Sequence, residues 1–181
     1  MSEREWNVVV STHAEGYRAA RAALRELGRV WRTDYFNVLV MKVDDIASFL
    51  EDVSRLATIN PPLMKEIARI APAAAAFDFE TAGEFERKLH DAALSRVAEL
   101  AGKSLHTRIH RRGMRHVISS CEEEQRLNQA LLDALASAGT PGSIDFADPD
   151  AVIAVETVGR RAGVSLWSRD DLRKYPFLKA D

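Results

Sequence analysis

The sequence predicts an α/β (α+β) protein made of two small domains, residues 1–80 and 81–181. Short β-branched segments alternate with segments whose apolar residues recur at helical spacing, which is typical of mixed folds. The chain has 181 residues, of which 46% are hydrophobic, and this suffices to fill two small cores. The pattern is interrupted near residues 77–83, and we therefore place the domain boundary there.

The first domain is predicted to contain a ferredoxin-like sheet with its helices on one face. Its elements follow in this order: a strand at 6–12, a helix at 17–27, strands at 29–33 and 36–43, a helix at 46–56, a short helix at 63–70 and a final strand at 75–79. Gly28 ends the first helix, and Asp44 or Asp45 caps the second. Two prolines, Pro61 and Pro62, then break the chain. A βαββα order completed by a last strand is the ferredoxin-like arrangement.

The second domain is predicted to combine two helices with a mixed sheet. Its elements are a helix at 84–101, a basic strand through 105–110, a helix that begins at Ser119 or Ser120, and strands at 143–146, 152–158 and 164–168. Gly102 marks the end of the first helix. A hydroxyl cap followed by Glu122 and Glu123 marks the start of the second, because acids are favoured by the helix dipole there.

Residues 103–120, KSLHTRIHRRGMRHVISS, concentrate positive charge in a chain whose formal net charge is −2. They include five cations and three histidines but no acid. In an extended strand alternate side chains share a face, so positions 105, 107 and 109 would pack while His106, Arg108 and His110 would form a cationic face. Cations that neutralise phosphates release condensed counterions, and nucleic acid is therefore the first candidate ligand.

The residues predicted to contact RNA lie in this segment and in the hairpin at 159–163: Lys103, Arg108, Arg111, Arg112, Arg115, His116, Arg160 and Arg161. Their role would be electrostatic and positional, without reading of base sequence. The two hairpin residues, with Arg169, Arg173 and Lys174, would extend the surface if the hairpin lies beside the basic strand. Alternatively, Asp170 and Asp171 would pair with this second group.

No cofactor, metal or catalytic group is predicted. Zinc accepts the residue types found at His106, His110, His116 and Cys121, but no nearby acid offsets the repulsion of a cation, and solvated histidines are expected. Cys121 is expected to be a small apolar filler rather than a nucleophile. The sequence contains no P-loop and no G-x-G-x-x-G fingerprint.

The chain is expected to be cytoplasmic and not to enter a membrane. No apolar run approaches the roughly 18 residues that a membrane helix needs. The first residues do not resemble a signal peptide. One cysteine excludes an internal disulfide and fits a reducing compartment.

Three sequence segments together resemble the THUMP domain. They are residues 105–132 (LHTRIHRRGMRHVISSCEEEQRLNQALL), 148–156 (DPDAVIAVE) and 162–166 (AGVSL). THUMP domains are RNA-binding modules of tRNA-modifying proteins, and an N-terminal ferredoxin-like domain commonly precedes them. Residues 67–72 (IARIAP) and 172–175 (LRKY) are most similar to stand-alone THUMP proteins that act as tRNA-binding adaptors in cytidine N4-acetylation.

The resemblance implies binding of tRNA without catalysis. In larger THUMP proteins the chemistry is carried out by an attached catalytic domain, and a chain ending at Asp181 is expected to be the RNA-holding part alone. It implies tRNA as partner, held at the acceptor stem or the single-stranded end, and a separate modifying enzyme.

Three other functions are compatible with the sequence. A ferredoxin-like sheet also builds small-molecule regulatory domains, which would bind a ligand without salt-dependent RNA affinity. An enzyme would use the histidines or Cys121. A protein scaffold would place the basic strand against an acidic partner.

Overall fold

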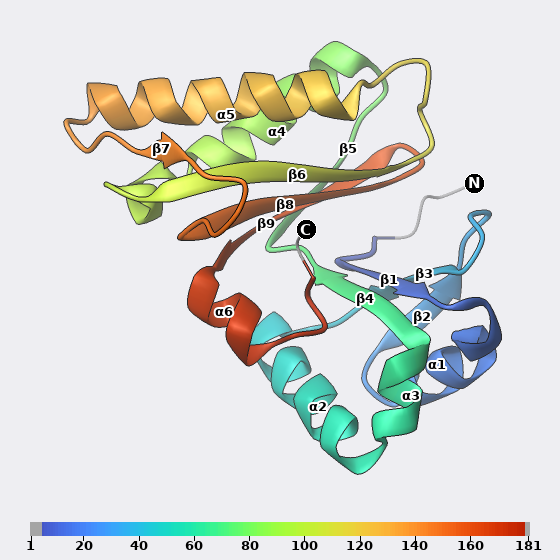
Figure 1. Cartoon of the computed structure of the whole chain (residues 1–181). Coiled ribbons are helices and arrows are strands. Elements are labelled where there is room, and N and C mark those ends of the chain that lie inside the picture. The colour runs from blue at the N-terminus through green and yellow to red at the C-terminus, as the bar shows by residue number, and fades with distance from the viewer. Residues whose placement is uncertain (1–4, 180–181) are drawn as a thin grey trace. The chain divides into compact units, whose positions relative to one another are not determined.

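The computed structural model describes residues 5–179, which form two compact units. The first unit runs to Pro72 and also includes Tyr175–Lys179, and the second spans Ala73–Lys174 (Figure 1). No helix in this described range combines the length and the apolar character that crossing a membrane requires.

The first unit has the βαββαβ order of a ferredoxin-like fold. Its elements are β1 (Val8–Thr12), the 3-10 turn η1 (Ala14–Gly16), α1 (Tyr17–Leu24), β2 (Arg29–Arg32), β3 (Val38–Lys42), α2 (Ile46–Ile59), α3 (Pro61–Glu66) and β4 (Ile67–Pro72). The strands are antiparallel in the order β2-β3-β1-β4, and the helices lie on one face of the sheet (Figure 1). The predicted fold of this half is confirmed.

Side-chain caps set the starts of two helices in the first unit. Asp45 Oδ2 accepts a hydrogen bond from Ser48 N at 2.8 Å and begins α2. Asn60 Oδ1 accepts from Leu63 N at 3.2 Å and begins α3. Prolines occupy the first positions of α3, where a missing N–H removes no helical hydrogen bond.

One predicted element of the first half was wrong, and another was assigned to the wrong sheet. Residues 67–72 form β4 rather than the end of a helix, with Ile70 opposite Val10 of β1. The strand predicted at 75–79 is β5 (Ala75–Asp78), which pairs with β9 of the second sheet instead of closing the first. The predicted domain limits, 1–80 and 81–181, put this strand in the first domain, whereas its hydrogen bonds lie in the second unit.

The second unit places two helices over one face of a mixed sheet. Its elements are β5, α4 (Ala82–Leu94), the 3-10 turn η2 (Val97–Leu100), β6 (Ser104–Arg112), α5 (Ser120–Ser137), β7 (Ser143–Ile144), β8 (Ala151–Val158), β9 (Arg161–Ser168) and α6 (Arg169–Lys174). The strand order is β5-β9-β8-β6-β7; β6 is parallel to β7 and β8, and β9 is antiparallel to β8 and β5. The mixed sheet is confirmed. The helix predicted at 84–101 ends at Leu94, the strand predicted at 143–146 is shorter, and α6 was not predicted.

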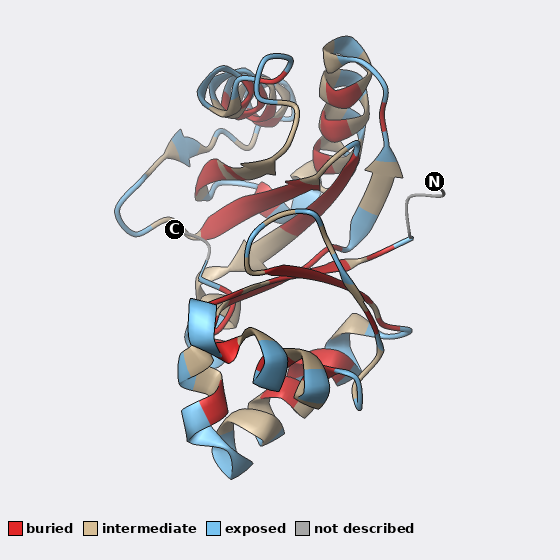
Figure 2. Cartoon of the chain, turned by 90° about the vertical axis from the view of Figure 1, so that its right-hand side faces the viewer, coloured by how far each residue is buried: buried red, intermediate tan, exposed pale blue. Residues whose placement is uncertain are grey.

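Buried residues of the second unit form one core between the sheet and α4 and α5. Leu105 and Ile109 of β6 belong to this core, together with Phe85 and Leu89 of α4 and Leu131 of α5. Figure 2 shows buried residues along the strands and on the helix turns that face them. The alternation predicted for the basic strand is therefore confirmed on its packed side.

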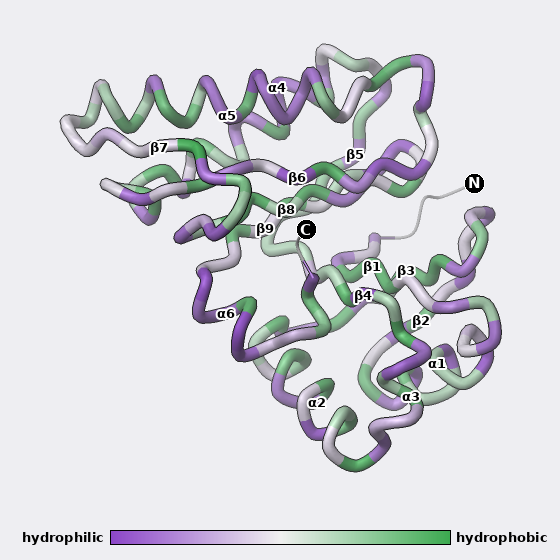
Figure 3. Tube along the Cα trace, viewed as in Figure 1, coloured by the Kyte–Doolittle hydropathy of each residue, from purple (hydrophilic) through white to green (hydrophobic). Residues whose placement is uncertain are grey.

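Two hydrogen bonds fix the position of α5 along β6. Within the described part of the chain, β6 has no partner strand on its β7 side beyond Leu105. Asn128 Oδ1 accepts from Thr107 N at 2.8 Å, and Glu124 Oε1 accepts from Ile109 N at 2.7 Å. Acceptors one helical turn apart thus satisfy alternate N–H groups of an open strand edge. Hydrophobic and hydrophilic residues alternate along α5 (Figure 3). The two hydrogen bonds to β6 place the first turn of α5 beside the end of that strand.

Candidate nucleic-acid interface

The loop between β6 and α5 borders a cleft rich in hydrogen-bond donors. Gly113 and Met114 both have positive φ angles, of 90° and 53°, and the chain turns sharply there as the glycine predicts. A cavity of about 550 Å³ follows, lined by Arg111, Arg115, His116 and residues 117–122. Because residues 120–122 form the first turn of α5, the positive end of the helix dipole adjoins these cations. The arrangement suits an anion.

Three predicted arginines have no ion pair among the residues that the structure describes: Arg108, Arg111 and Arg115. Arg111 and Arg115 line the cleft, whereas Arg108 lies in the middle of β6. Arg111 Nη1 donates to Gly113 O at 2.9 Å, while its buried Nε has no hydrogen-bond partner. Arg108 is half-buried on the face of β6 opposite the core, and its Nε also lacks a partner. Arg115 and His116 are exposed. These guanidinium groups are therefore available to an anion, and their contact with RNA stays a prediction.

Arg112 belongs to a buried ion pair rather than to this available set. Its Nη1 lies 2.5 Å from Glu156 Oε2 on β8, and the two side chains are 17% and 3% exposed. Burial lowers the pKa of Arg112 from its ordinary value, but a guanidinium stays protonated in proteins. Its charge is thus offset inside the fold, and phosphate contact by Arg112 remains a prediction.

The β8–β9 hairpin lies beside the end of β6, which is the condition under which Arg160 and Arg161 were predicted to extend the basic surface. Gly159 N, at the tip of this hairpin, donates to Arg112 O at 2.9 Å. Arg161 Nη1 pairs with Asp78 Oδ1 at 2.9 Å, however, and Arg160 pairs with Glu80. Both arginines thus lie near the end of β6, but each is offset by an acid, Asp78 at the end of β5 or Glu80 in the β5–α4 connection.

Lys103 and the remaining cations lie elsewhere. Lys103 precedes β6, and nine strand residues place it about 30 Å from Arg112. Arg169 pairs with Asp148 and Asp150 at 2.9 and 3.1 Å, not with the predicted Asp170 or Asp171. The second cationic group is therefore divided between the two ends of the sheet.

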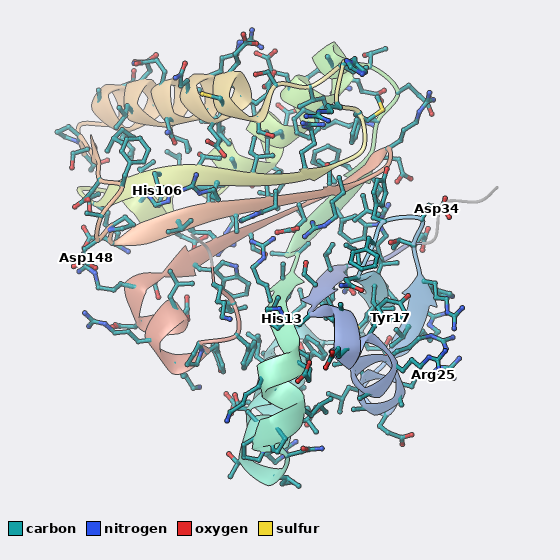
Figure 4. The ribbon with its side chains drawn as sticks, turned by 45° about the vertical axis from the view of Figure 1, so that its right-hand side comes forward. His13, Tyr17, Arg25, Asp34, His106 and Asp148 are labelled. Carbon is teal, nitrogen blue, oxygen red and sulfur yellow. The ribbon has the colours of Figure 1, made fainter. Side chains whose placement is uncertain are left out.

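The expectation of solvated histidines was wrong for His106. This side chain is 4% exposed, its Nδ1 is 2.9 Å from Asp145 O, and its ring centroid lies 5.5 Å from that of Phe146. His106 and Asp148 lie at the same end of the second unit (Figure 4), away from the β6–α5 loop. Cys121 is exposed on the first turn of α5 and is not an interior filler.

The comparisons with known proteins show the fold. No family model matches this chain, and no curated protein matches it in sequence. Among solved structures, PH1313 from Pyrococcus horikoshii Ot3 matches with a TM-score of 0.62 and 12% identity, covering 89% of this chain and 54% of that one. TrmN from Thermus thermophilus matches with a TM-score of 0.57 and 18% identity, covering 88% of this chain and 44% of that one.

A third structure is a complex. It is a 4-thiouridine synthetase with RNA and bound ATP, which matches with a TM-score of 0.56 and 12% identity and covers 90% of this chain and 41% of that one. This chain thus spans about half or less of each of these proteins. At such identities the likeness concerns the fold alone, and it supports the predicted THUMP arrangement, a ferredoxin-like unit followed by a THUMP-type unit, at that level.

Proposed function

We propose that this chain is a non-catalytic, cytoplasmic tRNA-binding protein that presents tRNA to a separate modification enzyme. The observation that carries the proposal is a pair of arginines, Arg111 and Arg115, which have no ion pair among the described residues and line the cleft at the first turn of an 18-residue helix. Arg108 adds a third guanidinium, on the opposite face of β6. Phosphates are the anions that such a group binds best, because guanidinium donors and helix N–H groups both reach phosphate oxygens.

Recognition would depend on the shape of the RNA. Contacts to phosphate fix the position of a nucleic acid but carry no base information. The THUMP resemblance indicates the acceptor stem or the single-stranded end of tRNA. Phe36, which is 85% exposed on the β2–β3 turn, is an aromatic residue available for stacking on an unpaired base, whereas Tyr175 is packed at 7% exposure.

The similar structures support a role in RNA modification. One of them is a 4-thiouridine synthetase in complex with RNA, and this chain covers 41% of that protein. We propose that the shared part holds the RNA and that a separate enzyme supplies the chemistry. Following the resemblance to the adaptor proteins, the reaction proposed is cytidine N4-acetylation.

The test is the affinity of the full chain for bulk tRNA across a salt series. Arg111→Ala/Arg115→Ala is the test variant, and Arg96→Ala is the matched control, because Arg96 is already bound to Glu99 near the C-terminal end of α4. Wild type and control should bind tRNA with a steep salt dependence. The double variant should bind at least about tenfold more weakly, with a salt slope reduced by about one for each lost phosphate contact.

Equal binding by all three proteins would refute the assignment of the surface, and salt-independent binding by wild type would refute the mechanism. The adaptor role has its own assay. Cytidine acetylation of tRNA by a tRNA acetyltransferase should rise when wild-type chain is added and should not rise with the double variant. An unchanged yield of acetylated tRNA would be compatible with RNA binding but would refute the adaptor role.

A small-molecule regulatory domain is the second candidate, and one observation favours it. An apolar cavity of about 320 Å³ lies in the second unit among Ala92, Leu100, Ile153, Val164 and Leu166. Its volume is at the lower limit for ligand pockets. Saturable binding of an apolar ligand by a chain with no salt-dependent tRNA affinity would favour this candidate.

A further inference from the structure

A cluster of possible metal ligands lies between α4 and α5, apart from the arginines of the candidate interface. Glu86 and His90 are one helical turn apart on α4, and Glu123 is in the first turn of α5. One ligand atom from each of the three residues lies within 4.8 Å of the others. The i, i+4 spacing turns the two α4 side chains to the same face, toward Glu123.

Two atoms of this cluster are buried and have no hydrogen-bond partner among the residues described. Glu123 Oε2 is one, on a side chain that is 5% exposed, and His90 Nε2 is the other. Leaving a buried polar atom unsatisfied costs about 1–3 kcal/mol and is rare in native proteins. A cation bound to both atoms would satisfy them.

The charged groups around this cluster carry a net negative charge, which favours a divalent cation. Arg126 contacts three carboxylates: Glu123 at 2.8 Å, Glu86 at 3.5 Å and Glu122 at 3.9 Å. Three carboxylates and one guanidinium leave two net negative charges. Arg126 Nη1 donates to Glu123 Oε1, so Glu123 Oε2 is left for a metal ion. Carboxylates that bind a metal are commonly oriented by such a hydrogen bond to a second group.

We propose that Glu86, His90 and Glu123 bind one divalent transition-metal ion, which ties α4 to α5. One imidazole nitrogen and two carboxylate oxygens are ligands that zinc and its first-row neighbours accept. Each contributes from a helix rather than a loop, so the ligand directions are set by packing. The sequence offered Glu86 and His90 at helical spacing, but Glu123 lies more than thirty residues further on.

The experiment is calorimetric titration of the chelator-treated full chain with Zn²⁺, together with thermal unfolding with and without the ion. Wild type should bind one ion and unfold at a higher temperature when Zn²⁺ is present. His90→Ala and Glu123→Gln should each bind at least about tenfold more weakly and lose the thermal shift.

Two controls distinguish this site from other zinc ligands. His13→Ala removes an exposed histidine of the first unit, and Cys121→Ser removes the exposed thiol; both should bind as wild type does. The proposal is overturned if wild type shows no saturable binding, if His90→Ala binds equally well, or if Cys121→Ser abolishes binding. His90→Gln serves as a second ligand variant should His90→Ala fail to fold.

Discussion

Replacing Arg112 by Met would separate a structural role of this residue from a role in RNA binding. Met keeps most of the aliphatic bulk and removes the charge, so Glu156, whose side chain is 3% exposed in the wild type, loses this ion pair. Removal of one partner of a buried ion pair costs about 3–5 kcal/mol. Arg112 itself is 17% exposed, and we therefore expect a loss near the lower value, about 3 kcal/mol.

The assay is urea unfolding at pH 7, followed by the fluorescence of Trp167 on β9. With Trp6 and Trp31 replaced by Phe throughout, this signal reports on the second unit alone. A denaturant dependence of about 1–3 kcal/mol per molar urea converts the loss into a midpoint lower by about 1–3 M. Arg112→Met/Glu156→Leu should regain most of the stability, because an apolar pair of similar volume replaces an ion pair at little or no cost.

A loss below about 1 kcal/mol, the range of exposed ion pairs, would refute the reasoning and leave Arg112 available to phosphate. Arg108→Met is the matched control, since Arg108 lies on the same face of β6 and has no ion pair with any residue between 5 and 179. It removes a buried Nε that lacks a partner, so the midpoint should stay the same or rise. Its effect should instead be weaker binding of tRNA.

Two further predictions concern the framework around β6. Asn128→Ala removes the acceptor for Thr107 N and should lower the free energy of unfolding by about 1–3 kcal/mol in the same urea assay. Gln129→Ala, on the exposed side of α5, is the control and should change the stability little. Equal losses in the two variants would contradict a role for Asn128 at the strand edge. Hydrogen bonds from the backbone and then the side chain of Ser104 hold the pKa of Asp150 below its usual 3.8. The ionised carboxylate therefore stabilises the fold above about pH 4, and this contribution is lost as the pH falls through the lowered native pKa. The difference in melting temperature between wild type and Asp150→Asn should therefore be largest above pH 4 and should shrink in acid; a difference that stays constant down to pH 2 would count against it.

Local patterns predicted most of the elements, and the two failures share one physical cause: the strands pair with partners that are distant in sequence. Residues 67–72 carry Ile67, Ile70 and Ala71 at a spacing that suits a helix, yet they form β4 because pairing with β1 supplies the backbone hydrogen bonds. Residues 75–78 were correctly predicted as a strand but assigned to the wrong sheet. Phe77 pairs with Ala162, far along the chain, and no local pattern specifies such a partner.

The same limit applies to the candidate site. Runs of arginine are visible in sequence, and they indicated the end of β6 where the structure has a cleft lined by Arg111 and Arg115. The acids that offset some of them are not visible, because Arg112 and Glu156 are 44 residues apart and Arg161 and Asp78 are 83 apart. Charge counted within a window of sequence therefore overestimated the number of available cations, and only the fold separates Arg112 from Arg108.

Helix α5 connects the two proposals through three consecutive acids with different surroundings. Glu122 lines the cleft beside Arg115, Glu123 faces α4, and Glu124 binds the edge of β6. The bond from Glu124 fixes the rotation of the helix, and this rotation directs Glu123 toward Glu86 and His90. A change of one residue in this register would turn Glu123 away from α4 and move the first turn of α5 away from Arg111. The order of these acids, rather than their total charge, is therefore what the folded structure requires.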